Sequence, residues 1–180
     1  TAASAGSSVC VNLLLVGLLP GIGLGISAAT FVGRSLGEGK PAAAWAWGWD
    51  VTRVAVVLMT LIGLPLILLP NLVLGFFLES ASTVALTRPS LQIIGATMAL
   101  EAVSLVLMQS LLGAGASGFV MMVSVGLQWG LFLPVAYLLG PFFGYGLTAI
   151  WLWNAAYRAI SALCFVVVWN RRSWTAIKLS

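Results

Sequence analysis

Two ionisable side chains stand in the middle of long apolar segments. Glu101 lies at the centre of residues 91–112, and Arg158 lies midway along residues 145–169. An unpaired charged carboxylate at the centre of a bilayer costs several kcal/mol, so Glu101 should be protonated, bound to an ion or paired. A carboxyl in such a place can exchange a proton for a cationic solute. The alternative is a buried acid that only fixes the packing of helices.

Polar residues accompany both groups at helical spacing. Thr97 precedes Glu101 by four residues and Ser104 follows it by three, so all three share one helix face. Asn154 stands in the same relation to Arg158, and Gln128 lies in a further apolar segment. These side chains predict either a cavity wall or hydrogen bonds between helices. Glu101 and Arg158 lie at similar depth, which allows an ion pair, but a water-facing arginine is equally consistent with the sequence.

The composition removes several classes of chemistry. The 180 residues include no histidine, so a Ser-His pair and a histidine-ligated metal are excluded. Asp50 is the only aspartate, which excludes an aspartyl protease with both acids in this chain. A G-x-x-x-x-G-K-[ST] phosphate loop is also missing. We therefore expect no enzymatic activity, no cofactor and no bound metal centre.

The hydropathy predicts an all-α polytopic membrane protein. Hydrophobic residues make up 61% and charged residues 7% of the sequence, with a mean hydropathy of +1.11. A spanning helix needs about 20 apolar residues, so the length allows five or six spans. In the second segment, Pro65 and Pro70 predict a kink and then a stop, and Pro89 suits the first position of the third. The expected spans are 8–33, 50–74, 89–112, 119–139 and 145–169.

The distribution of basic residues predicts the orientation of the chain. With five spans, six of the eight Lys and Arg residues fall on one side of the membrane. The positive-inside rule then places the loop at 33–41 and the C-terminus in the cytoplasm of a cell-membrane protein. The net charge of +4 is thus explained by topology, and we expect no nucleic-acid partner. The start at Thr1, without a methionine, predicts a piece of a longer polypeptide.

Three short stretches, in this order, resemble the multidrug and toxic compound extrusion (MATE) transporters. Residues 20–40 contain a glycine-rich segment that runs into Val32-Gly33-Arg34-Ser35-Leu36-Gly37-Glu38-Gly39, which is similar to a cytoplasmic turn of that family. Residues 110–115 resemble the turn that ends a later helix, and residues 146–151 with 171–174 resemble the last helix and tail. The resemblance covers nearly the whole chain.

The resemblance implies a fold and an activity. The chain would supply helices eight to twelve, most of one lobe of a twelve-helix transporter, with the N-terminal lobe as its partner. The family exports organic cations in exchange for protons or sodium ions by alternating access. An acid twelve residues before the turn glycine takes part in cation coupling, a role that falls on Glu101, twelve residues before Gly113. The chain departs from the family in having glutamate rather than aspartate there, Leu112 in place of an arginine, and Arg158.

Two other functions stay open at this point. A flippase for lipid-linked sugars or polysaccharide precursors, from the same superfamily, would need a basic cavity for phosphates, and Arg158 favours it. A membrane subunit without transport activity is the other alternative. The expected partners are membrane lipid and small cationic substrates, and the sequence decides neither the substrate nor the coupling ion.

Overall fold

The computed structural model describes residues 2–77, 80–137 and 146–176, and its regular elements in these ranges are all helices. Five of them are long and apolar enough to cross a membrane. This confirms the all-α polytopic fold and makes the chain a multi-pass membrane protein. The helices are α1 (Ala2–Gly37), α2 (Pro41–Leu68), the short α3 (Pro70–Gly75), α4 (Ala81–Gly113), α5 (Ser117–Leu127), the π-helix η1 (Gln128–Phe132), α6 (Leu133–Tyr137), α7 (Gly146–Arg171) and the 3₁₀ turn η3 (Ser173–Ala176).

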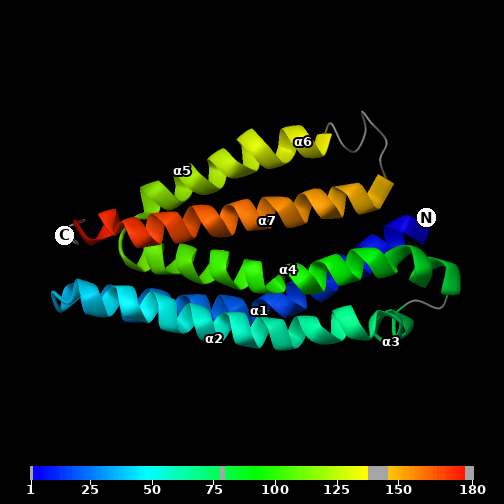
Figure 1. Ribbon diagram of the computed structural model, residues 1–180, viewed down its shortest axis with the longest axis horizontal. Helices are drawn as coiled ribbons and strands as arrows, with labels where there is room; N and C mark the ends of the chain where they lie inside the picture. The colour runs from blue at the N-terminus through cyan, green and yellow to red at the C-terminus, as the bar shows by residue number, and fades with distance from the viewer. Residues whose placement is uncertain (1, 78–79, 138–145, 177–180) are drawn as a thin grey trace.

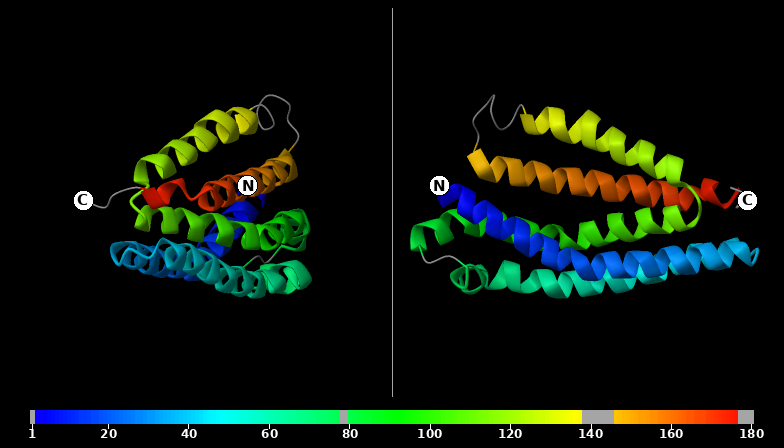
Figure 2. Two further views of the ribbon diagram at one scale, coloured as in Figure 1. Left: turned by 60° about the vertical axis from the view of Figure 1, so that its left-hand side comes forward. Right: turned by 180° about the vertical axis from the view of Figure 1, so that it is seen from behind.

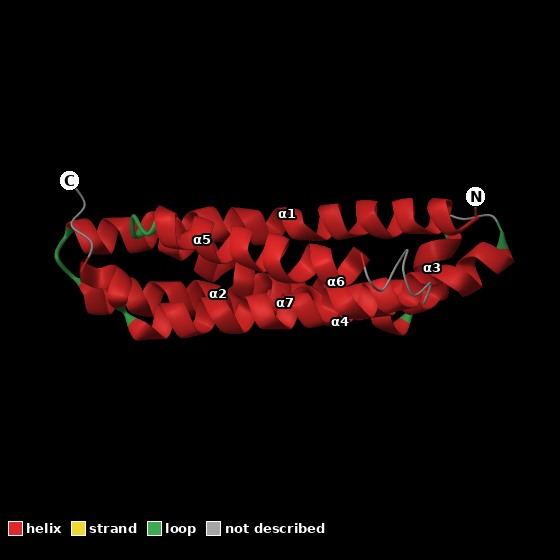
Figure 3. Ribbon diagram, turned by 90° about the horizontal axis from the view of Figure 1, so that it is seen from above, coloured by secondary structure: helices red, strands yellow, loops and turns green. Residues whose placement is uncertain are grey.

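The long helices lie side by side in an elongated bundle (Figures 1 and 3), and α4 lies at its centre in the view of Figure 1. On one side α4 packs against α1 and α2, and on the other side it packs against α7. The segment formed by α5, η1 and α6 covers the far side of α7 (Figure 2). The N- and C-terminal ends of the chain lie at opposite ends of the bundle (Figure 1).

The contact between α2 and α4 is close because both helices carry a glycine where they meet. A Cβ atom placed on Gly63 would lie 2.6 Å from the carbonyl oxygen of Gly95, and one on Gly95 would lie 2.8 Å from that of Gly63. Small residues allow helix backbones to approach in this way in membranes, where dispersion contacts replace the hydrophobic effect between helices. Met98 and Ala102 continue the buried face of α4 from this point.

Two turns at the same end of the bundle are built alike. After α1, Gly39 has a φ of +71° and the amide of Lys40 donates to the Ser35 carbonyl at 2.9 Å. After α4, Gly115 has a φ of +79° and the amide of Ala116 donates to the Leu111 carbonyl at 2.9 Å. This six-to-one hydrogen bond with a left-handed glycine ends a helix tightly. The first helix therefore continues to Gly37, and the expected loop at 33–41 begins later in the structure.

The expected segment 50–74 is divided in the structure. The second helix begins earlier, at Pro41, and ends at Leu68, and Leu69 has φ −125° and ψ 45° before α3 begins at Pro70. The ring of a proline disfavours helical geometry in the residue before it, which explains the break at Leu69. Pro65 lies inside α2, three residues before its end.

The third expected segment is longer than its proline suggested. Helix α4 begins at Ala81, so Pro89 lies inside the helix and not at its first position. Membrane helices tolerate an internal proline because hydroxyl side chains and neighbouring helices compensate for the lost backbone bond.

The fourth expected segment, 119–139, contains a change of helix type. The amide of Leu133 donates to the Gln128 carbonyl, five residues back, and Gln128–Phe132 forms a π-helix. Pro134 follows directly; it has no N–H to give to the Gly130 carbonyl, and its ring would press on that carbonyl in an α-helix. The wider π turn relieves this conflict. The expected boundaries at 139 and 145 lie outside the described residues.

Tryptophan side chains pack the end of α7 against α2. The ring of Trp169 is fully buried, stacks on Trp174 with 4.2 Å between ring centroids, and lies against Gly48 of α2. The guanidinium of Arg172 lies 4.6 Å from the ring centroid of Trp45. This arrangement orders the segment that follows α7 and fixes the helix lengthwise in the bundle.

Candidate functional site

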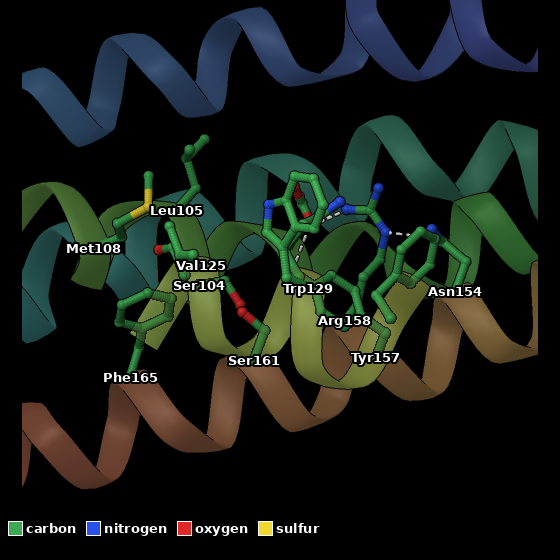
Figure 4. Close-up of a pocket in the computed structure, with 14 residues that line it drawn as sticks. Ser104, Leu105, Met108, Val125, Trp129, Asn154, Tyr157, Arg158, Ser161 and Phe165 are labelled. Carbon is green, nitrogen blue, oxygen red and sulfur yellow. Dashed lines mark hydrogen bonds and ion pairs between the residues drawn. The ribbon is translucent and has the colours of Figure 1, made fainter. Parts of the chain in front are cut away.

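A cavity of about 560 Å³ lies between α4, the α5–η1 segment and α7 (Figure 4). Its described lining combines polar, ionisable and aromatic side chains. The polar and ionisable ones are Glu101, Ser104, Ser124, Gln128, Asn154, Tyr157, Arg158 and Ser161. The position of α7 between α4 and α5 brings these residues together, although they are far apart in the sequence (Figure 1).

Glu101 and Arg158 form an ion pair in this cavity. A terminal nitrogen of the guanidinium contacts Oε2 of the carboxylate, and the exposed fractions of the two side chains are 13% for Arg158 and 21% for Glu101. The Nε of Arg158 donates to Oδ1 of Asn154 at 2.8 Å, one turn earlier on α7 (Figure 4). The structure therefore adopts the pairing that was one of two arrangements consistent with the sequence.

The π-helix supplies the opposite wall of the cavity. The Tyr157 hydroxyl of α7 donates to Oε1 of Gln128 at 3.0 Å, and the ring of Tyr157 meets Phe132 with 4.9 Å between centroids. Trp129, also in η1, lines the same space and lies close to Arg158 in Figure 4. Polar and aromatic groups thus alternate around the ion pair.

Ser104 is a lining residue whose hydroxyl oxygen is itself buried. The residue is only 9% exposed, and this oxygen has no hydrogen-bond partner among the described residues. A buried hydroxyl without a partner costs free energy. It lies one turn along α4 from Glu101, on the same face.

Other predicted positions are placed elsewhere. The Thr97 hydroxyl donates to the carbonyls of Ile93 and Ile94, both at 3.0 Å, and Thr97 is not one of the described residues that line the cavity. Its hydroxyl serves its own helix. The Nε1 of Trp153 donates to the Phe132 carbonyl at 3.3 Å, which is a packing contact. The side chain of Trp151 lies outside the described part of the structure.

The sequence analysis missed the aromatic part of the lining. Phe165 could have been found, because Asn154, Arg158, Ser161 and Phe165 follow one face of α7 at helical spacing. Trp129 and Phe132 could not be found in the same way. Their orientation depends on the π-helix, which changes the angular spacing of the residues after Gln128.

The lining is suited to a cation without a multi-acid metal site. Among the described residues, no group of three or more His, Cys, Asp or Glu side chains could hold a metal ion. The described lining contains one carboxylate, that of Glu101, which is paired with Arg158, and the side-chain oxygen of Gln128, which accepts from Tyr157. Oxygen ligands of this kind suit a hard monovalent cation or a proton, and aromatic rings attract organic cations.

Several known proteins are similar to this chain in sequence. Over 94% of its length the chain is 28% identical to the "Probable multidrug resistance protein NorM" of Brucella suis. It is 28% identical to the "Uncharacterized transporter YisQ" of Bacillus subtilis over 91% of its length, and 24% identical to "Protein DETOXIFICATION 39" of Arabidopsis thaliana over 93%. It spans 37%, 36% and 33% of these three relatives, respectively.

The match to a protein family covers most of the chain. The sequence model of the MatE family matches residues 1–138, a range that contains α1 to α6 and therefore Glu101, Ser104 and Gln128. Arg158 lies beyond the matched range. A match of this extent means that the protein belongs to the MatE family of transporters.

Proposed function

We propose that this chain is part of a secondary active multidrug exporter that moves organic cations out of the cell in exchange for protons or sodium ions. The observation that carries the proposal is the position of Glu101 inside a cavity of about 560 Å³ in a MatE-family chain. The multidrug resistance names of the NorM relatives are consistent with it. In this proposal the Glu101 carboxylate binds the coupling ion and the substrate alternately.

The chemistry of the lining supports a cationic substrate. A carboxylate in a partly dry cavity attracts a positive charge more strongly than one in water. Trp129, Phe132 and Tyr157 offer π-faces to an organic cation, worth about 0.5–2 kcal/mol for each well-placed ring.

Alternating access requires two lobes, and this chain supplies part of one. The chain spans 37% of the Brucella relative, so we propose that the second lobe closes the cavity and that rocking of the two lobes exposes it to either side. We also propose that the end of the bundle with the turns after α1 and α4 faces the cytoplasm, together with the C-terminus.

Replacing Glu101 by Gln in the complete protein tests the coupling role. The substitution keeps the side-chain volume and removes the ionisable group, so we expect gradient-driven efflux of a fluorescent organic cation to be lost, with insertion into the membrane retained. The assay is efflux from proteoliposomes under an imposed proton gradient and, separately, a sodium gradient. The matched control is Glu38→Gln, a change at an exposed acid outside the cavity, which should leave efflux unchanged.

The other results of this assay point to different conclusions. Equal efflux by wild type and Glu101→Gln would contradict the coupling role and make Glu101 a packing residue. Absence of efflux under both gradients, even for wild type, would favour the flippase function, for which Arg158 in the cavity is the supporting observation.

A further inference from the structure

The described lining of the cavity carries one acid and one base, Glu101 and Arg158, and so has no net charge. From neighbouring elements the cavity receives only neutral polar groups: Ser124 and Gln128 from α5 and η1, and Asn154, Tyr157 and Ser161 from α7. A cation that enters therefore meets a carboxylate whose charge is already neutralised by a guanidinium of the same protein.

The guanidinium remains charged at every accessible pH and presents five N–H donors in a fixed plane. It contacts the Glu101 carboxylate through a terminal nitrogen and keeps Asn154 as a second acceptor through Nε. Asn154 belongs to α7, so this hydrogen bond persists if the terminal nitrogens leave the carboxylate. The guanidinium of Arg158 is thus held by Asn154 at its Nε, while its terminal nitrogens are able to turn from Glu101 into the cavity.

We propose that Arg158 is an intramolecular competitor of the transported cation, which occupies the Glu101 carboxylate in the empty cavity and must be displaced before a substrate cation can bind there. This rests on the proposed function, since it assigns a role to a second residue of the same site. It makes Arg158 a residue that determines specificity.

The competition sets a threshold for binding. When a cation that offers only its charge binds, it forms one ion pair with Glu101 and breaks the ion pair between Glu101 and Arg158. The net gain in binding free energy is therefore small, and the displaced guanidinium repels the cation. A cation that also stacks on Trp129 and Tyr157 gains contacts that Arg158 does not make. The competitor therefore selects large aromatic cations and keeps the carboxylate from binding abundant small ones.

The test is equilibrium binding of tetraphenylphosphonium to the complete purified protein, without any gradient. Arg158→Gln should bind the probe roughly tenfold or more tightly than wild type, because a nearby positive charge and a competitor are both removed. The matched control is Arg53→Gln, the same substitution at an exposed ion pair on α2 away from the cavity, which should leave the affinity unchanged. A folded Arg158→Gln protein with equal or weaker affinity would overturn the proposal.

A second variant covers the case in which Arg158→Gln does not fold. Asn154→Ala keeps both charges and removes only the hydrogen bond that positions the guanidinium, so the affinity for the probe should rise severalfold. An unchanged or lower affinity in folded Asn154→Ala would overturn the competitor role. Added methylguanidinium should compete with the probe in Arg158→Ala, where it can take the vacated place, and not in wild type.

These results separate the two proposals. If wild type binds the probe and the Arg158 and Asn154 variants bind it no better, only the competitor role fails. If wild type and every folded variant bind no probe at all, the cation-export function fails and the competitor role fails with it.

Discussion

Glu101 and Arg158 illustrate how far residue types alone can be interpreted. Two charges in the middle of apolar segments must find partners, and this rule singled out both residues without any structure. The choice between an ion pair and separate water-facing positions depends on which helices are neighbours, which no local pattern contains. The contact of α4 with α7 decides it, and it brings the carboxylate and the guanidinium together.

Glu38 provides a second charged contact, outside the spanning helices. Lys40 and Arg34 both place nitrogens 3.0 Å from its carboxylate oxygens, and these hydrogen bonds, with that of Lys40 the larger effect, hold the pKa of Glu38 below its ordinary value of 4.5. A lowered pKa in the folded state means that the contact stabilises the fold above pH 4.5 and is lost as the pH falls through the lowered value.

We therefore expect Glu38→Gln to lower the thermal midpoint of the protein slightly at pH 7. The difference from wild type should shrink as the pH is lowered below 4.5. It should also shrink at high salt, because the carboxylate is exposed and salt screens its interaction with Lys40 and Arg34. The measurement is thermal unfolding in detergent across a pH series. A difference that stays constant from neutral to acidic pH would show that Glu38 acts through something other than its charge.

At the scale of the elements, the apolar segments predicted the number of spanning helices, and the family resemblance of residues 110–115 predicted the turn that ends α4. What could not be predicted was the effect of each proline. Pro70 ends a helix, Pro89 is accommodated inside α4, and Pro134 follows a π-helix. The outcome depends on whether neighbouring groups compensate for the missing N–H, which is a property of the packed bundle.

Pro134→Ala tests whether the π-helix positions the cavity wall. Alanine restores the N–H donor to the Gly130 carbonyl and removes the steric conflict, so residues 128–132 should return to α-helical spacing. This rotates Gln128 and Trp129 with respect to α7 and breaks the 3.0 Å hydrogen bond between Gln128 and Tyr157. We expect undiminished thermal stability together with several-fold weaker binding of tetraphenylphosphonium. Unchanged affinity in the stable variant would mean that the π turn does not shape the site.

At the scale of the whole molecule, the bundle has two unlike ends. One end carries the two glycine-terminated turns, the Glu38 contacts, the tryptophan cluster and Arg171 and Arg172, while the other carries α3 and the start of α4 (Figure 1). Basic residues concentrated at one end are what the positive-inside rule associates with the cytoplasmic face. Tryptophans at that end match the aromatic belt of a membrane interface.

This asymmetry predicts the orientation of the complete protein in the cell membrane. Single cysteines introduced at Lys40 and at Arg171, both exposed, should react with a membrane-impermeant maleimide only after the cells are permeabilised. A cysteine at Asn71, exposed on α3 at the other end, should react in intact cells. The background protein should lack its other cysteines, including Cys10 and Cys164. Labelling of position 71 only after permeabilisation, with positions 40 and 171 reactive in intact cells, would invert the topology.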